Sequence, residues 1–274
     1  MNILEKIIAF KHIEVAEKSS LVPVKLLEQS IYFQSKVVSM KKYVADPEKT
    51  GIIAEFKRKS PSKGAINVTA SIEKTSIGYM QAGASALSVL TDKEFFGGSI
   101  EDLKMARKFN FCPILRKDFI VDEYQILESK SIGADCILLI AAALDPKRLK
   151  ELAAFAKSLG MEVLMEVHDA QELDESLNEH LDLVGINNRS LKTFEVDLKT
   201  SFDLVNSIPN EFVKISESGI SKPETLVELK NAGFDGFLIG ETFMKSSRPH
   251  QAAYNFMNEY RKLLRESKGL VLEK

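Results

Sequence analysis

The chain has 274 residues, 45% of them hydrophobic and 28% charged, and its 37 Lys+Arg against 39 Asp+Glu give a net charge of −2. This composition is typical of a globular protein and argues against a strongly basic nucleic-acid-binding protein. No run of 18 apolar residues occurs, so no membrane span is expected, and charges interrupt the apolar residues of the N-terminus as they do not in a signal peptide. Cys112 and Cys136 are too few for a zinc motif or a disulfide framework, so we expect two buried, reduced thiols in a cytoplasmic protein.

Amphipathic helices are predicted before the first strand. Residues 2–18 place Ile3, Leu4, Ile7 and Ile8 on one face, and a second helix is predicted over about 24–43. We expect residues 1–50 to form a helical extension.

Short apolar strands then alternate with amphipathic helices to the end of the chain. The predicted strands are 51–57, 86–91, 113–117, 136–140, 162–167, 183–187, 213–217 and 236–240, a mean spacing of roughly 26 residues. Eight such units predict a parallel sheet closed into a (β/α)8 barrel, also called a TIM barrel. An open doubly wound sheet is the alternative, but no Gly-rich dinucleotide motif follows the first strand. We expect residues 1–274 to form one barrel domain, with residues 1–50 over its mouth.

Charged residues stand at the carboxyl ends of these strands, where barrel active sites lie. Glu55 and Lys57 are two apart on the first strand and therefore share a face. Buried charges are costly unless they are paired or used, which makes this pair a candidate site. Four further strand ends carry polar residues, namely Lys117, Glu166, Asn187 and Glu217. Opposed Lys and Glu in one cleft would shift each other's pKa, as acid–base chemistry requires.

Two loops near the end of the chain predict a phosphate site. Ser218 and Gly219 follow the seventh strand, whereas Gly240 and Glu241 follow the eighth and begin a short helix. Backbone N–H groups in these two loops are the usual phosphate ligands of such barrels.

The four histidines, His12, His168, His180 and His250, show no metal-ligand spacing. We expect His168, after the fifth strand, to be an exposed loop residue, with an approach to the mouth as the alternative. Phe96 and Phe119 could pack against an aromatic substrate or simply within the protein.

The motifs as a set resemble those of the indole-3-glycerol-phosphate synthase family of tryptophan biosynthesis. The matching segments are Ile53–Ser62, Leu87–Asp92, Phe96–Ser99, Pro113–Val121, Gly185–Arg189, Glu217–Ser221 and Leu238–Gly240. They follow one another in order along the whole chain, after the helical extension.

This resemblance implies a carboxy-lyase without metal or other cofactor. It would convert 1-(2-carboxyphenylamino)-1-deoxyribulose 5-phosphate to indole-3-glycerol phosphate, carbon dioxide and water. By position, Lys117 is implied to be the general acid and Glu166 the acid–base group of dehydration, while Glu55 and Lys57 bind and orient the substrate. Other implied substrate contacts are Ser60, Phe96, Phe119, Asn187, Arg189, Leu191 and Glu217, and the implied phosphate cradle comprises Ser218, Gly219, Gly240 and Glu241.

Two positions depart from the family pattern or from simple electrostatics. Arg116 precedes Lys117 and should point out of the barrel. The carboxylate of Glu241 would repel a phosphate, so we expect its backbone N–H to serve while its side chain turns away.

Alternative functions are a non-catalytic barrel that binds a phosphorylated metabolite, or another phosphate-binding enzyme of the same pathway. Phosphoribosylanthranilate isomerase and the tryptophan synthase α chain are examples, but they lack the long N-terminal extension. In every case the expected partner is a small phosphorylated molecule, with no nucleic acid or membrane, and the protein is expected to be a monomer or a weak homo-oligomer.

Overall fold

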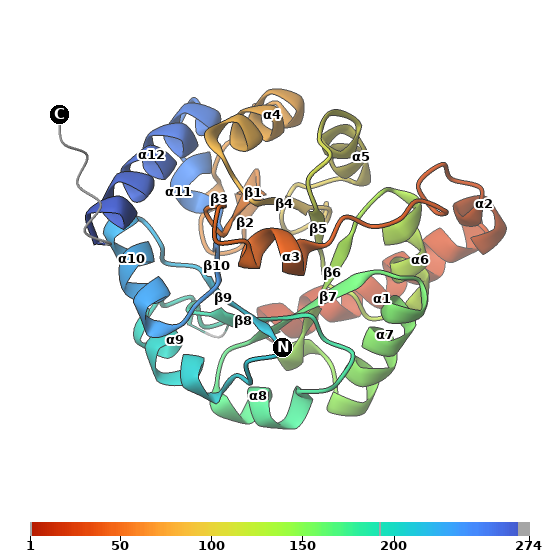
Figure 1. Cartoon of the computed structure of the whole chain (residues 1–274). Coiled ribbons are helices and arrows are strands. Elements are labelled where there is room, and N and C mark those ends of the chain that lie inside the picture. The colour runs from red at the N-terminus through yellow and green to blue at the C-terminus, as the bar shows by residue number, and fades with distance from the viewer. Residues whose placement is uncertain (1, 192, 268–274) are drawn as a thin grey trace.

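Eight parallel strands close into a barrel within a ring of helices in the computed structural model of the chain (Figure 1). The structure describes residues 2–191 and 193–267. The barrel strands are β1 (Ile52–Phe56), β4 (Ala86–Leu90), β5 (Ile114–Lys117), β6 (Cys136–Ile140), β7 (Glu162–Val167), β8 (Leu183–Asn187), β9 (Val213–Glu217) and β10 (Gly236–Ile239). They pair in the order β1-β10-β9-β8-β7-β6-β5-β4, and β4 returns to β1. The predicted (β/α)8 barrel is confirmed, and the open sheet is excluded.

Helices connect the strands and cover the outside of the barrel. They are α4 (Ile72–Ala82), α5 (Ile100–Phe109), α6 (Glu123–Ser131), α7 (Pro146–Ser158), α8 (Ala170–Ser176), α9 (Lys199–Leu204), α10 (Pro223–Ala232), α11 (Glu241–Met244) and α12 (Pro249–Ser267), with single 3-10 turns η1 (Ala141–Ala143) and η2 (Val205–Ser207). Their ends follow local chemistry. Asp145 caps α7 by accepting a hydrogen bond from the backbone of Arg148, and α10 ends at Gly233 in the left-handed conformation. A small hairpin of β2 (Lys59–Ser60) and β3 (Gly64–Ala65) lies in the loop after β1.

Alternation along the strands divides the apolar residues between two cores. Ile53 packs inside the barrel, whereas its neighbours Ile52 and Ala54 face the helices. Leu115, Leu164 and Ile215 also fill the interior, each two residues before a polar strand end. Burial of such a side chain stabilises the fold by roughly 1.5–3 kcal/mol. Apolar side chains therefore fill the barrel interior directly below the polar strand ends.

The N-terminal segment contains three helices, α1 (Ile3–Leu21), α2 (Val24–Glu28) and α3 (Met40–Ala45). The predicted first helix is confirmed, but the prediction of one helix over 24–43 is wrong. Ser39 starts a new helix there, because its side chain caps α3 by accepting from the backbone of Lys42. Two acidic side chains of the barrel also bind this segment, since Asp135 accepts from the backbone N–H of Val38 and Glu162 from the hydroxyl of Ser39. These long-range bonds override the helical pattern.

The helices α1 and α3 lie at opposite ends of the barrel. Ile3, Leu4 and Ile7 of α1 line the cavity at the carboxyl ends of the strands. By contrast, the segment that leads into α3 binds Glu162, the first residue of β7. Figure 1 shows α3 in front of the barrel and α1 behind it. Only part of residues 1–50 therefore covers the mouth, because α2 packs beside α6 on the outside of the barrel and α3 lies at the other end.

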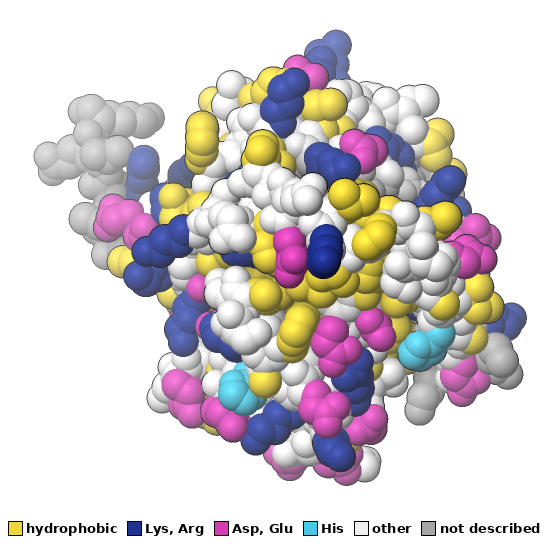
Figure 2. All heavy atoms as spheres, turned by 90° about the vertical axis from the view of Figure 1, so that its right-hand side faces the viewer, with side chains coloured by type: hydrophobic (Ala, Val, Ile, Leu, Met, Phe, Trp, Pro, Cys, Tyr) yellow, Lys and Arg dark blue, Asp and Glu magenta, His cyan; other side chains and the backbone are white. Residues whose placement is uncertain are grey.

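Figure 2 shows the right-hand side of Figure 1, where α1, α2, α6 and α7 are labelled. Hydrophobic side chains gather across the middle of this face among charged ones. Ile13, Leu21 and Leu26 of the N-terminal helices are among the exposed apolar residues of the chain.

Within residues 2–191 and 193–267, no helix is both long and apolar enough to cross a bilayer.

Candidate active site

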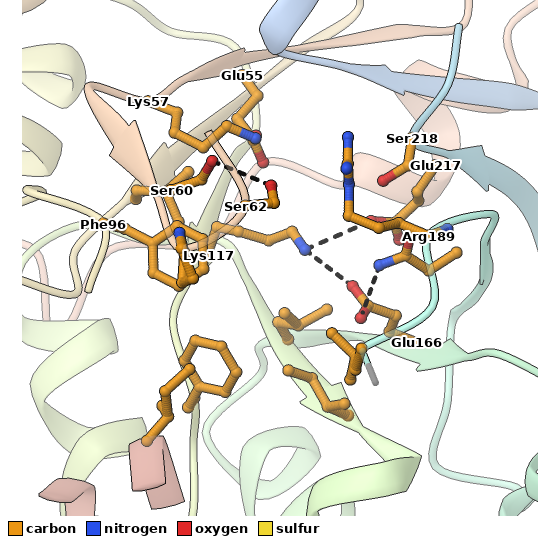
Figure 3. A pocket seen from close by; sticks show the side chains of 18 of the residues that line it. Glu55, Lys57, Ser60, Ser62, Phe96, Lys117, Glu166, Arg189, Glu217 and Ser218 are labelled. Atoms are coloured by element: carbon orange, nitrogen blue, oxygen red, sulfur yellow. Dashed lines mark hydrogen bonds and ion pairs between the residues drawn. The ribbon is translucent and has the colours of Figure 1, made fainter. Parts of the chain in front are cut away.

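The polar strand ends converge on one ammonium group, that of Lys117 at the end of β5 (Figure 3). Its Nζ donates a hydrogen bond of 2.9 Å to Oε2 of Glu166 and lies 3.4 Å from Oε2 of Glu217. Both carboxylates are almost fully buried, with 2% of each side chain exposed. Asn187 donates to the other oxygen of Glu166, Oε1, at 3.1 Å. The four residues come from β5, β7, β8 and β9, so barrel closure alone brings them together.

Burial and charge separate the two carboxylates. Burial by itself would raise the pKa of Glu166, but the charges of Lys117 and His168 outweigh it and lower this pKa to about 2. Burial raises the pKa of Glu217 to about 7, against the attraction of Lys117 and with added repulsion from Glu166 and Glu55. For Lys117, burial would lower the pKa, yet the three surrounding carboxylates raise it above its ordinary value. Near neutral pH the site thus holds an ammonium, one ionised carboxylate and one carboxyl that titrates.

Glu55 and Lys57 form a second ion pair on the same rim, as the spacing on β1 predicts. Lys57 Nζ lies 2.8 Å from Glu55 Oε1. Gly240 gives this carboxylate its space, because a Cβ there would lie 2.6 Å from Glu55 Oε1. Gly185 does the same for Glu217, whose Oε1 would overlap a Cβ at position 185. That oxygen is buried and has no hydrogen-bond partner among the described residues, so an acceptor is free for a ligand.

An apolar wall completes this cavity, which has a volume of about 120 Å³. Phe96 and Phe119 pack with their ring centroids 5.8 Å apart, and Leu191 joins them on the lining. Ile3 and Leu4 of α1 cover them from the N-terminal side. The surface suits an aromatic ring and excludes water from the charged centre.

A second cavity, of about 400 Å³, continues the first toward the loops after β9 and β10. Ser218 and Gly219 line it with consecutive positive φ angles of 68° and 78°, a backbone that only glycine adopts without strain. Gly240 lies opposite at the start of α11, and Lys63 and Lys245 add two cations. This combination of loop backbone and ammonium groups suits a phosphate dianion.

The side chain of Glu241 does not turn away from this cavity, so that expectation is wrong. It lines both cavities, because Arg189 holds it with a 3.2 Å contact to Oε2 and Lys63 lies 3.7 Å from Oε1. Two cations compensate the carboxylate that a phosphate would otherwise meet.

The expectation that His168 is an exposed loop residue is also wrong, since only 12% of its side chain is exposed. Its Nε2 lies 3.6 Å from Glu166 Oε1, and its Nδ1 lies 3.1 Å from Glu172 Oε2. Burial would lower the pKa of His168, but the hydrogen bond to Glu172 and the charge of Glu166 raise it above its ordinary value. The alternative, an approach to the mouth, is the correct one.

A buried ion cluster holds α1 over the mouth. Lys11, 1% exposed, places its Nζ 2.9 Å from both Asp92 Oδ2 and Asp118 Oδ1, and 2.7 Å from Glu14. Asp92 follows β4, and Asp118 follows Lys117 directly. The carboxylates raise the pKa of Lys11 above its ordinary value although burial would lower it. Position 11 thus connects the cover of the cavity to the strand end that carries Lys117.

Arg116 points out of the barrel, as expected from its place beside Lys117. It is 1% exposed, binds Glu128 at 2.7 Å and donates to the hydroxyl of Ser129. Asp118 lies between the two networks, since it contacts Arg116 at 3.2 Å as well as Lys11.

Every residue predicted for the site lines one of the two connected cavities. The first contains Glu55, Lys57, Ser60, Phe96, Lys117, Phe119, Glu166, Asn187, Arg189, Leu191, Glu217, Ser218 and Glu241, and the second adds Gly219 and Gly240. Sequence reasoning missed Lys63, Lys245 and Lys11 as parts of the site or its support. The first two lie in loops and the third on a helix, so the strand-end rule could not find them.

Comparison with known proteins identifies the family of these features. The family model described as indole-3-glycerol phosphate synthase matches residues 4–256. A protein of that name from Bacteroides thetaiotaomicron is 49% identical over 256 residues, which cover 93% of this chain and 98% of the relative. Another from Polaromonas naphthalenivorans is 43% identical over 94% of this chain and 99% of the relative. Among solved structures, tryptophan synthase subunit alpha from Legionella pneumophila has a TM-score of 0.59 at 14% identity, covering 83% of this chain and 97% of that one, which shows a shared fold.

Proposed function

The chain belongs to the indole-3-glycerol phosphate synthase family, and we propose how its own residues divide the work of that reaction. The enzyme closes the indole ring of 1-(2-carboxyphenylamino)-1-deoxyribulose 5-phosphate, with loss of carbon dioxide and water, in tryptophan biosynthesis. One observation carries the proposal. A largely buried ammonium, Lys117, lies between two carboxylates and beside an apolar wall that would hold an aryl ring.

The two connected cavities suggest how the substrate lies. The phosphate would bind the Ser218–Gly219 and Gly240–Glu241 loops with Lys63 and Lys245, and the aryl ring would pack against Phe96, Phe119 and Leu191. The ribulose carbons would then cross the strand ends between them. Lys57 would meet the substrate carboxylate, while Glu55 orients Lys57 through their 2.8 Å contact. A substrate folded in this way has its reacting carbons close together, which accounts for a large part of ring closure.

Proton transfer would follow the charges at the centre. As the aryl carbon that bears the carboxylate attacks the ketone carbon, Lys117 gives a proton to the ketone oxygen. The amine nitrogen supplies the electrons for this bond, and the iminium that results accepts those released when carbon dioxide leaves. The new hydroxyl then departs as water with a second proton, which Lys117 supplies after it has been reprotonated from solvent, while ionised Glu166 takes a proton from the adjacent CH2 carbon. The substrate, with its carboxyl group ionised, gains two protons and loses one. Each turnover therefore consumes one proton.

Other polar groups would hold the sugar chain. The buried Oε1 of Glu217 has no hydrogen-bond partner among the described residues and would accept a bond from a substrate hydroxyl. Asn187 fixes Glu166 through its 3.1 Å bond, and Arg189, next to it, compensates Glu241 beside the phosphate. Ser60 would add a contact from the first loop.

The test is incubation with the substrate while the fluorescence of the indole product is followed. Replacement of Lys117 by Met should lower kcat by at least about 100-fold, the usual contribution of a positioned acid, and leave substrate binding largely intact. Lys108→Met on the exposed end of α5 is a matched control, because that lysine lies over the ring of Phe109 and does not line either cavity. Full activity of Lys117→Met would disprove the assignment of the acid.

The organisation of the chain is part of the proposal. We propose one barrel domain over 1–274, although residues 1, 192 and 268–274 lie outside the described structure. We further propose that the protein is a monomer or a weak homo-oligomer. Two buried free cysteines support a cytoplasmic location.

A further inference from the structure

His168 contacts only one of the two carboxylates that bind Lys117. Lys117 is shared, at 2.9 Å from Glu166 and 3.4 Å from Glu217, and therefore favours ionisation of both. Of these two carboxylates, the one within ion-pair distance of His168 is Glu166, whose Oε1 lies 3.6 Å from Nε2. Glu217 has instead an oxygen with no hydrogen-bond partner among residues 2–191 and 193–267. The difference between the two carboxylates thus arises on the side away from Lys117.

Glu172 of α8 fixes the histidine ring and favours its charged form. Its Oε2 accepts from the backbone N–H of His168 at 2.8 Å and lies 3.1 Å from Nδ1. A carboxylate on one nitrogen and Glu166 near the other favour an imidazolium with both nitrogens protonated. Nε2 itself is buried and forms no hydrogen bond within the described chain, and Glu166 is the carboxylate at ion-pair distance from it.

A third cavity, of about 500 Å³, borders His168 on the side away from Lys117. Exposed carboxylates, those of Asp169, Glu195 and Asp197, line it together with Glu172. The charged groups that face His168 are therefore all acidic, namely Glu166 from β7, Glu217 from β9 and Glu172 from α8. The exposed rim allows the imidazole to exchange protons with water while α1 covers the mouth.

The charge balance of the mouth makes this position important. Glu55, Glu166 and Glu217 face two ammonium groups, those of Lys57 and Lys117, so one carboxylate exceeds the available cations. One of the three carboxylates is therefore expected to be protonated near neutral pH. A cation beside Glu166 adds to the hydrogen bond of Asn187 there and to the charge of Glu55 near Glu217, and all three favour an ionised Glu166 and a protonated Glu217.

We propose that His168 is a positioning residue that selects Glu166, rather than Glu217, as the ionised carboxylate of the active site. The inference rests on the proposed role of Glu166 as the base of dehydration. The imidazolium also fixes Glu166 Oε1 together with Asn187, so that the base lies still between Lys117 on one side and His168 on the other. The contact between His168 and Glu166 therefore keeps Glu166 ionised and also holds its carboxylate in place.

The kinetic test replaces His168 by Asn, which keeps the backbone bond to Glu172 and removes the cation. We expect kcat to fall about tenfold or more, equivalent to at least about 1.4 kcal/mol, while KM changes by less than about twofold. His180→Asn is the control, because His180 also lies 3.6 Å from a glutamate, Glu179, but away from the mouth. A wild-type kcat in His168→Asn, with its fold verified by circular dichroism, would overturn the proposal.

A second measurement is independent of activity and of the folding of the His168 variant. In ¹⁵N NMR spectra of the full chain, the imidazole of His168 should show a pKa above its ordinary value. Glu166→Gln and Glu172→Gln should each lower it, because each removes one of the flanking charges. In Glu172→Gln the decline of kcat at alkaline pH should move to lower pH for the same reason.

The outcomes separate the two proposals. If Glu166→Gln keeps full activity but still lowers the pKa of His168, the proposed role of Glu166 is wrong although the contact exists. If Glu166→Gln is inactive and the pKa of His168 does not respond to it, the proposed function stands and the selection by His168 is wrong.

Discussion

Replacement of Lys11 by methionine should loosen α1 from the barrel. Methionine fills nearly the same space, but it leaves Asp92 and Asp118 without the cation that lies 2.9 Å from each. Both carboxylates are at most 2% exposed, so water cannot take the place of the ammonium. The loss is therefore one of charge compensation and not of packing.

The magnitude follows from this burial. Removal of one partner from a buried ion pair costs about 3–5 kcal/mol, and Arg116 still compensates Asp118 at 3.2 Å, so we expect about 3 kcal/mol. With a urea dependence of about 3 kcal/mol per molar, the unfolding midpoint should fall by about 1 M. Because Ile3, Leu4 and Ile7 line the aryl end of the cavity, KM should also rise.

The assay is urea unfolding followed by circular dichroism, together with KM from the fluorescence of the indole product. Lys18→Met is the matched control on the same helix, because Lys18 pairs with Glu14 with a third of its side chain exposed and should contribute less than about 1 kcal/mol. The additional changes Asp92→Asn and Asp118→Asn should restore part of the stability lost in Lys11→Met. An unfolding midpoint and KM equal to those of the wild type would refute the reasoning.

Two further predictions concern the surroundings of Glu217. Gly185→Ala should lower kcat by about 100-fold without unfolding the barrel, because the new Cβ displaces the Glu217 carboxylate; steady-state kinetics with a circular dichroism control test this, and unchanged kcat contradicts it. The raised pKa of Glu217 means that its neutral form stabilises the fold below its unfolded pKa and that this contribution is lost as pH rises through about 7. Glu217→Gln should therefore gain stability relative to the wild type between about pH 5 and pH 8 in urea unfolding, and a constant difference would contradict the titration.

The barrel and its charged rim could be predicted because both follow from periodicity. Apolar strands at regular spacing predicted closure, and the rule that sites lie at carboxyl ends found Lys117, Glu166 and Glu217. Side chains alternate along these strands, so the neighbours of an inward residue point outward. Arg116 could be assigned to the outside for this reason.

The positions that could not be predicted depend on contacts far apart in sequence. His168 lies in the turn after β7, and nothing local shows that Glu172 and Glu166 hold it on both sides. The prediction of one helix over 24–43 was wrong for the same reason, since Asp135 and Glu162 bind backbone groups of residues 38–41. Periodicity describes one element at a time and carries no information about such partners.

The N-terminal segment also has a consequence for synthesis on the ribosome. Ser39 emerges first, but its partner Glu162 lies 123 residues later in the chain. At about 5–20 residues per second, the segment before α3 waits roughly 6–25 s for that carboxylate to be translated. The apolar face of α3 is exposed during this interval, together with strand edges of an unclosed sheet. We therefore expect nascent chains that stop before β7 to be targets of chaperones, and chains to be released once β9 and β10 have covered α3.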